Sequence, residues 1–283
     1  MTTAHRLDRI GLNVRDLDAA TAFYVEALGF TAATPRDADP AMARLLGAQT
    51  MQVARMGRGR QVMELAATDP PGAPYPPDSH SNDAWFQHCA LVTDDIAADH
   101  ARLARHAFTP ISRHGPQKLP GGIVAFKFRD PDGHPLELIQ FPSPDRRTAG
   151  GIDHSAIVVS DVDRTIGFYT ARLGLAVQAR KVNAGPAQAA LDDLDGPTVD
   201  VVALAPAEPA PHVELLGYRT PRGRTPRPLH LHDIAAARLV FATASPLPGA
   251  ATTVLSDGTI VTLLRDPDGH VLLLEQEPQR AQD

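Results

Sequence analysis

The alternation of hydrophobic and polar residues repeats along this chain. Residues 9–30, RIGLNVRDLDAATAFYVEALGF, and residues 154–175, HSAIVVSDVDRTIGFYTARLGL, have the same order of residue types. Each begins with the alternation typical of a strand and continues with hydrophobic residues three and four apart, which predict a helix. An aspartate stands where the helix would begin and Leu-Gly where it would end, as expected for helix caps. Each segment therefore predicts a strand followed by a helix.

A second pair of similar segments predicts two β-hairpins. FRDPDGHPLEL at 128–138 and LRDPDGHVLLL at 264–274 share the phrase RDPDGH. Proline followed by Asp-Gly is turn chemistry, and alternating hydrophobic residues stand on both sides of it. We interpret the phrase as a structural turn without catalytic chemistry, in which His134 and His270 are exposed.

A third strand-and-helix pattern, HCALVTDDIAADHARLARHAF at 88–108, indicates two modules in each half of the chain. Every module predicts a strand, a helix and three strands. The modules span about 7–68, 84–141, 150–218 and 229–277. Proline-rich segments separate the first from the second and the third from the fourth. The fourth module is short, and the two prolines of ATASPLPGAATT predict that it lacks its helix.

The composition favours a soluble globular protein. The chain has 283 residues, of which 43% are hydrophobic and 21% charged, and its net charge is −6. Because it has no block of lysine or arginine, we expect neither nucleic acid nor an anionic membrane as a partner. Cys89 is the one cysteine, which excludes an internal disulfide. The amino terminus has no long hydrophobic run, so we expect a cytoplasmic protein.

Single glutamates interrupt several hydrophobic strands. They are Glu64 in QVMELAA, Glu137 in PLELIQF and Glu214 in HVELLGY. An ionised carboxylate in such a strand is unfavourable unless it is paired or binds a metal. The pattern therefore leaves two alternatives, a metal site or a cluster of salt bridges.

The four-module pattern resembles the vicinal oxygen chelate superfamily, which includes glyoxalase I, extradiol dioxygenases and bleomycin-resistance proteins. The resemblance covers nearly the whole chain and rests on DRIGLNVRDLDAATAFYVEALGF, WFQHCALV, FRDPDGHPLELIQF and DHSAIVVSDVDRTIGFYTARLGL. It implies an α+β fold of four βαβββ modules, paired into two domains with cupped, partly open mixed β-sheets, the fourth module being degenerate. With consecutive modules paired, the domains would span 1–145 and 150–278.

The resemblance also implies metal ligands on the first and last strands of each module. These positions match Arg9, Glu64, His88 and Glu137 in the first domain, and His154, Glu214, Arg238 and Leu273 in the second, with Glu275 as an alternative to Leu273. The first domain would then hold one divalent ion (Mn, Fe, Co, Ni or Zn) on Glu64, His88 and Glu137. We interpret His154 and Glu214 as a relic or a structural pair.

The leading hypothesis is a metal-dependent enzyme with glyoxalase-type lyase or isomerase chemistry on a small oxygenated substrate, through a metal-bound enediolate. Glu64 or Glu137 would act as general base, while Arg9, Trp85 and Phe86 would contact the substrate. One alternative is an extradiol-type ring-cleaving dioxygenase. Another is a metal-free binding protein in which Arg9 takes the place of the metal. We expect a monomer or a homodimer.

Overall fold

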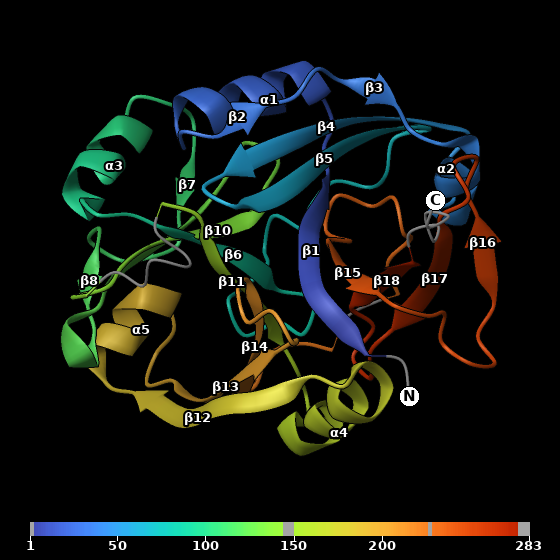
Figure 1. Cartoon of the computed structure of the whole chain (residues 1–283). Helices are drawn as coiled ribbons and strands as arrows, with labels where there is room; N and C mark the ends of the chain where they lie inside the picture. Colours follow the sequence, from blue (N-terminus) through green and yellow to red (C-terminus); the bar gives the residue numbers. More distant parts are fainter. Residues whose placement is uncertain (1–2, 144–149, 226–227, 277–283) are drawn as a thin grey trace.

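The computed structural model describes residues 3–143, 150–225 and 228–276. Within these ranges two mixed β-sheets, A and B, contain nine strands each, and the helices lie around them (Figure 1). Parallel and antiparallel strand pairs occur in both sheets. The expected α+β architecture of repeated modules is therefore confirmed.

Sheet A is built from the first and the last modules of the chain, which meet where β1 pairs antiparallel with β15. Its strands in spatial order are β16 (Thr252–Val254), β17 (Ile260–Arg265), β18 (Val271–Gln276), β15 (Arg238–Thr243), β1 (Ala4–Asn13), β5 (Gln61–Asp69), β4 (Thr50–Arg58) and β2 (Thr31–Ala32), with β3 (Arg36–Asp37) also paired to β4.

Sheet B is built from the second and third modules, which meet where β6 pairs antiparallel with β11. Its strands in spatial order are β12 (Ala176–Ala184), β13 (Thr198–Ala205), β14 (His212–Thr220), β11 (Ile152–Val158), β6 (Gln87–Val92), β10 (Pro135–Gln140), β9 (Val124–Arg129) and β7 (Thr109–Pro110), with β8 (Gln117–Lys118) also paired to β9.

The three long helices each follow the first strand of a module, and the shorter ones lie farther along the chain. The long helices are α1 (Leu17–Glu26), α3 (Ile96–Leu103) and α4 (Val162–Leu173), with two shorter helices α2 (Pro40–Leu45) and α5 (Pro186–Asp192) and a 3₁₀ turn η1 (Pro120–Gly122). The three long helices begin after Asp16, Asp95 and Asp161, whose carboxylates accept a hydrogen bond from a backbone N–H of the first turn. The described residues between β15 and β16 form no helix, as predicted. None of the described helices is long and apolar enough to cross a membrane.

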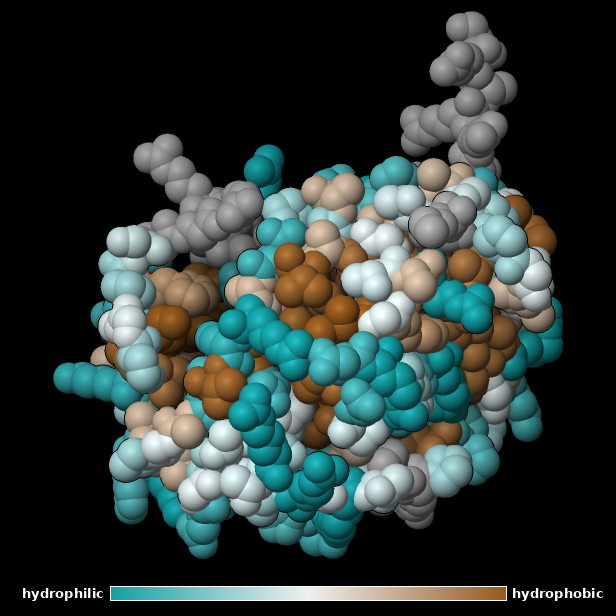
Figure 2. Space-filling view, turned by 90° about the horizontal axis from the view of Figure 1, so that it is seen from below, coloured by the Kyte–Doolittle hydropathy of each residue, from teal (hydrophilic) through white to brown (hydrophobic). Residues whose placement is uncertain are grey.

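One continuous hydrophobic core connects the two sheets. Alternate strand residues face it, among them Ile10 of sheet A and Leu91 and Leu138 of sheet B. Tyr24 of α1 and Tyr169 of α4 are fully buried in the same core. The other face of each sheet lines a cavity. On the side of the molecule drawn in Figure 2, hydrophobic residues are visible mainly in recesses between hydrophilic ones.

The pairing of the modules differs from the order expected from the sequence. The first module pairs with the fourth and the second with the third, so neither half of the chain completes a sheet by itself. The first strands of the modules meet through backbone hydrogen bonds, which any sequence can make. The alternation of hydrophobic and polar residues along these strands defines which side chains face the core. It does not show whether a strand pairs with the next module or with a distant one.

The two RDPDGH turns are buried joints between the sheets. Asp130 accepts hydrogen bonds from the backbone N–H groups of Asp132 and His134 and contacts His134 Nδ1 at 2.8 Å. The hydroxyl of Tyr24, on the helix of the sheet A module, donates to the same carboxylate at 2.9 Å. His134 and His270 are only 2% and 7% exposed. The expectation of exposed histidines is wrong because other parts of the chain cover the turns.

Candidate metal centre

Sheet B brings two histidines and two glutamates to one face. The residues, which we call the His/Glu cluster, are His88 on β6, Glu137 on β10, His154 on β11 and Glu214 on β14. These four strands are neighbours in the sheet. Strand alternation directs the four side chains away from the core, because the residues beside them, such as Leu138, face the core.

Ligand atoms of three members of the cluster, His88, Glu137 and His154, lie within 4.8 Å of one another, close enough to share one ion. Glu137 Oε2 lies 3.5 Å from His88 Nε2 and 3.6 Å from His154 Nε2. Glu214 Oε2 lies 3.7 Å from His154 Nε2. Ligand atoms about 2.1 Å from a common ion are separated by about 3–4 Å, which matches these distances. The donor set of imidazoles and carboxylates suits a divalent transition metal.

The histidines of the cluster have buried nitrogens without a hydrogen bond. Both ring nitrogens of His88 and Nε2 of His154 make none with the described residues. A buried polar atom without a partner is destabilising by about 1–3 kcal/mol. A bound cation would take one ring nitrogen of each histidine as a ligand, so the residues that are present fit a metal.

Asp153 orients the second histidine. Its Oδ2 lies 2.9 Å from His154 Nδ1, which leaves Nε2 directed at the glutamates. Metal-binding histidines commonly donate their other N–H group to a carboxylate in this way, which fixes the tautomer and the ring orientation. The contact is therefore a second observation that agrees with a metal site.

The charge states of Glu137 and His88 suit metal binding, whereas His154 has to lose a proton first. Burial alone would raise the pKa of Glu137, but His88, Lys127 and His154 lower it to about 2. Burial opposes the charge on His154, yet Glu214 and Asp153 raise its pKa to about 9. Burial and Lys127 lower the pKa of His88. Glu137 is thus a carboxylate and His88 a neutral imidazole near pH 7, the forms in which each binds metal. His154 is an imidazolium at that pH and would release its proton when a cation binds.

The His/Glu cluster lines a cavity of about 240 Å³, which we call the sheet B cavity. Apolar side chains of Leu119, Ile123 and Phe141 line one part of it, and Lys181 of β12 lines another. A small molecule with polar and apolar parts can therefore contact the cluster. Lys127, also in the lining, forms a buried salt bridge at 2.7 Å with the last residue of α5.

The corresponding sheet A cavity, of about 890 Å³, contains a guanidinium in place of such a cluster. Arg9 makes a bidentate salt bridge with Glu275 at 2.6 and 2.8 Å, and its Nε lies 3.3 Å from Glu64. Arg238 is fully buried and donates to Asn13. Arg9 thus pairs with both carboxylates, which is the salt-bridge alternative left open by the sequence.

The structure divides the three predicted metal ligands between the cavities. His88 and Glu137 lie together in sheet B, whereas Glu64 lies in sheet A, because its module pairs with the fourth. His154 and Glu214, interpreted from the sequence as a relic, lie beside His88 and Glu137 instead. A signal for them was present. Pairing the second module with the third collects four suitable residues at the first-strand and last-strand positions, whereas consecutive pairing divides these four two and two.

The three predicted substrate-binding residues lie elsewhere. Arg9 is clamped by glutamates in sheet A and is 5% exposed. Trp85 lies under the guanidinium of Arg224, 5.0 Å from the ring centre, and does not line the sheet B cavity. Phe86 is fully buried, with its ring centre 5.9 Å from that of His88, so it packs beside the cluster without reaching the cavity.

Comparisons with known proteins agree with this architecture. Glyoxalase I from Zea mays superimposes with a TM-score of 0.65 at 20% identity, covering 96% of this chain and 92% of that chain. A structure titled as a dioxygenase from Bacillus subtilis gives a TM-score of 0.60 at 14% identity, covering 98% of this chain and 87% of that one. At these identities the likeness concerns the fold.

Curated relatives match parts of the sequence. A lactoylglutathione lyase from Arabidopsis thaliana is 28% identical over 176 residues, 60% of this chain and 54% of the relative. A lactoylglutathione lyase from Oryza sativa is 32% identical over 109 residues, 38% of this chain and 35% of the relative. The matches thus span about half or less of these relatives. The family model of the Glyoxalase/Bleomycin resistance protein/Dioxygenase superfamily matches residues 6–138 and 151–274, and the chain belongs to this family.

Proposed function

We propose that this protein is a divalent-metal-dependent enzyme that performs glyoxalase-type lyase or isomerase chemistry on a small oxygenated substrate. The observation that carries the proposal is the convergence of His88, Glu137, His154 and Glu214 from four neighbouring strands on the sheet B cavity. Mn, Fe, Co, Ni and Zn are all compatible with two imidazoles and two carboxylates. A cation bound there would supply Lewis-acid polarisation of substrate oxygens.

Glu137 and Glu214 would have different roles. The side chain of Glu137 is 5% exposed and lies within 3.6 Å of both histidines, so it anchors the cluster. The side chain of Glu214 is 16% exposed and approaches one of them, so more of its carboxylate faces the cavity. Glu214 is the group we assign to moving a proton between adjacent carbons of the substrate, as general base and then general acid.

The relatives indicate which substrate to test first. Their names describe lyases of lactoylglutathione, a molecule with adjacent oxygenated carbons. Leu119, Ile123 and Phe141 would shield the reacting carbons from water, and Lys181 offers a cation to an anionic group. Both cavities are completed within one chain, which supports a monomer as the working unit. The cytoplasm is the compartment we propose for it.

The test is metal analysis of the purified full-length protein. We expect near-stoichiometric divalent metal in the native protein and in the Glu64→Gln variant, because Glu64 lies in the sheet A cavity. We expect at least a tenfold loss in His154→Ala, together with loss of lactoylglutathione turnover. Equal metal content in His154→Ala and the native protein would contradict the assignment. Oxygen consumption with a catechol panel would instead identify a dioxygenase.

A further inference from the structure

The arginines that begin the two RDPDGH turns are held in the same way. Arg129 and Arg265 each donate one hydrogen bond to the glycine carbonyl of their own turn, at 2.9 Å. Each also donates a second hydrogen bond of 2.9 Å to a backbone carbonyl near a proline-rich segment. Arg129 donates to Ser79, and Arg265 donates to Leu229. The two guanidinium groups are therefore equivalent in position, and what covers each of them can be compared directly.

Aromatic rings cover only the first of these arginines. The Arg129 guanidinium lies 5.2 Å from the ring centre of Tyr75 and 5.7 Å from that of Phe86. Tyr75 also packs against the turn glycine, Gly133. Over Arg265 the described residues place no aromatic ring within that range. Counting back from the first ligand position of each module, Phe86 corresponds to Ala236.

A cavity occupies the place of the missing rings. It has a volume of about 600 Å³, and we call it the hairpin cavity. Three small residues, Ala235, Ala236 and Ala237, line it together with Arg265 and Trp85. A Cβ added at Gly269 would meet no described atom within 4 Å. No member of the His/Glu cluster lines this cavity, so it is separate from the proposed active site.

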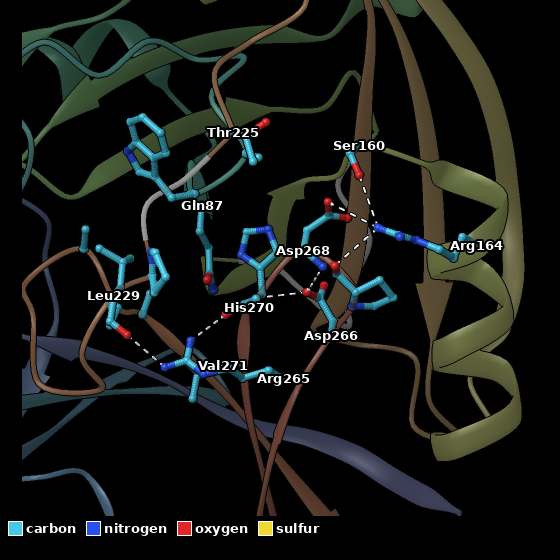
Figure 3. Close-up of a pocket in the computed structure, with 18 residues that line it drawn as sticks. Gln87, Ser160, Arg164, Thr225, Leu229, Arg265, Asp266, Asp268, His270 and Val271 are labelled. Atoms are coloured by element: carbon cyan, nitrogen blue, oxygen red, sulfur yellow. Dashed lines mark hydrogen bonds and ion pairs between the residues drawn. The ribbon is translucent and has the colours of Figure 1, made fainter.

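The polar groups around the hairpin cavity are held at its edge (Figure 3). Arg265 reaches the carbonyl of Leu229, and Arg164 reaches Ser160 and the turn carrying Asp268, while His270 and Gln87 face the space between. Arg164 lies 3.7 Å from the Asp268 carboxylate, and the described lining contains two arginines and two aspartates, so it has no excess of charge. Trp85 also lines the cavity, although its indole Nε1 is enclosed by protein.

We propose that the hairpin cavity binds a planar aromatic small molecule. Its ring lies on the guanidinium of Arg265, as the rings of Tyr75 and Phe86 lie on Arg129, because a guanidinium attracts the face of an aromatic ring. The three alanines make room for the ring, and Trp85 lines the same cavity. The volume falls within the range of small-molecule sites.

The experiment uses the full chain with 2-naphthol as the probe and 2-decalol, its saturated and non-planar analogue, as the control. Trp85 is the only tryptophan, so the protein gives one indole N–H resonance. We expect saturable binding of 2-naphthol by calorimetry, with a shift of that resonance, and at least tenfold weaker binding of 2-decalol. His154→Ala, outside the hairpin cavity, should bind 2-naphthol as the native protein does even when its metal is lost.

Two substitutions test the position of the ring. Ala236→Phe restores the counterpart of Phe86 and should weaken 2-naphthol binding at least tenfold. Arg265→Lys keeps the charge but removes the planar face of the guanidinium, and should weaken 2-naphthol binding several-fold. This second variant keeps the test valid if Ala236→Phe prevents folding. Absence of binding, an unmoved indole resonance, equal binding of 2-decalol, or native affinity in both variants would overturn the proposal.

Discussion

At the scale of single residues, two carboxylates in one cluster have unequal surroundings. Glu137 lies between two histidines, whereas Glu214 contacts one and is more exposed to the cavity. We expect Glu137→Gln to lose metal affinity by at least tenfold. We expect Glu214→Gln to keep most of its metal, because an amide oxygen can still coordinate, and to lower kcat by about 10²–10⁴, the usual contribution of a general base. Metal titration and steady-state kinetics measure the two effects, and equal metal loss in both variants would contradict the division of roles.

The buried Asp130–His134 pair makes stability depend on pH. Burial opposes charge on both groups, but His134 lowers the pKa of Asp130 and Asp130 raises that of His134. The contribution of Asp130 is present above the unfolded pKa of about 3.9 and is lost as the pH falls through its lower folded value. The contribution of His134 is present below about 6.5 and is lost as the pH rises through its higher folded value.

Asp130→Asn should therefore be most destabilising between about pH 4 and 6.5. We expect a decrease of about 3 kcal/mol in the free energy of unfolding there, because one partner of a buried ion pair is removed. The difference from the native protein should become smaller at both more acidic and more alkaline pH. Urea unfolding at a series of pH values measures it, and a difference that is constant with pH would show that the pair is not charged.

At the scale of elements, strand β14 carries Glu214 and packs against the start of α4. A Cβ added at Gly217 would lie 2.3 Å from Cγ2 of Val162, the first residue of α4, and a β-branched side chain cannot turn away freely. Gly217→Ala should lower the free energy of unfolding by about 1–3 kcal/mol.

Gly167→Ala is the matched control. Gly167 lies in the middle of α4 with no described neighbour within 4 Å of an added Cβ, so this substitution should raise the free energy of unfolding by about 0.5–1 kcal/mol. Thermal unfolding compares them, and a stable Gly217→Ala protein would contradict the close packing.

The elements themselves were largely predictable from the sequence. Asp16, Asp95 and Asp161 cap helices because each precedes a residue pattern of helical period, and the two prolines near 246 correctly predict a missing helix. The alternation along β10 correctly directs Glu137 away from the core. The burial of His134 was not predictable, because it depends on other parts of the chain that cover its turn. Local pattern thus determines an element, whereas its neighbours determine how exposed it is.

At the scale of the whole molecule, the partner of each module was the feature that the sequence left open. Consecutive and crossed pairing use the same strands with the same alternation, so the hydrophobic pattern is satisfied by either. Two of the three predicted metal ligands, His88 and Glu137, belong to one module and stay together under both arrangements. Glu64 belongs to a different module, and its assignment depended on the pairing.

Separated halves of the chain test the crossed pairing. Residues 1–143 alone would leave β1 and β6 without β15 and β11, and unpaired strand edges promote association. We expect either half, 1–143 or 150–283, to form oligomers or aggregates by size-exclusion chromatography with light scattering. Mixed during refolding, the halves should form a 1:1 complex that binds metal. A monomeric 1–143 fragment that binds metal by itself would support the consecutive pairing instead.

The crossed pairing has a consequence for how the two cavities can differ. A polypeptide of half this length, associating with an identical copy, would necessarily build two identical sites. Covalent continuity between the halves removes that symmetry, so Arg9 can face Glu275 in one site while His88 faces Glu137 in the other. A single chain can therefore enclose two chemically distinct interiors, each of which can change without the other.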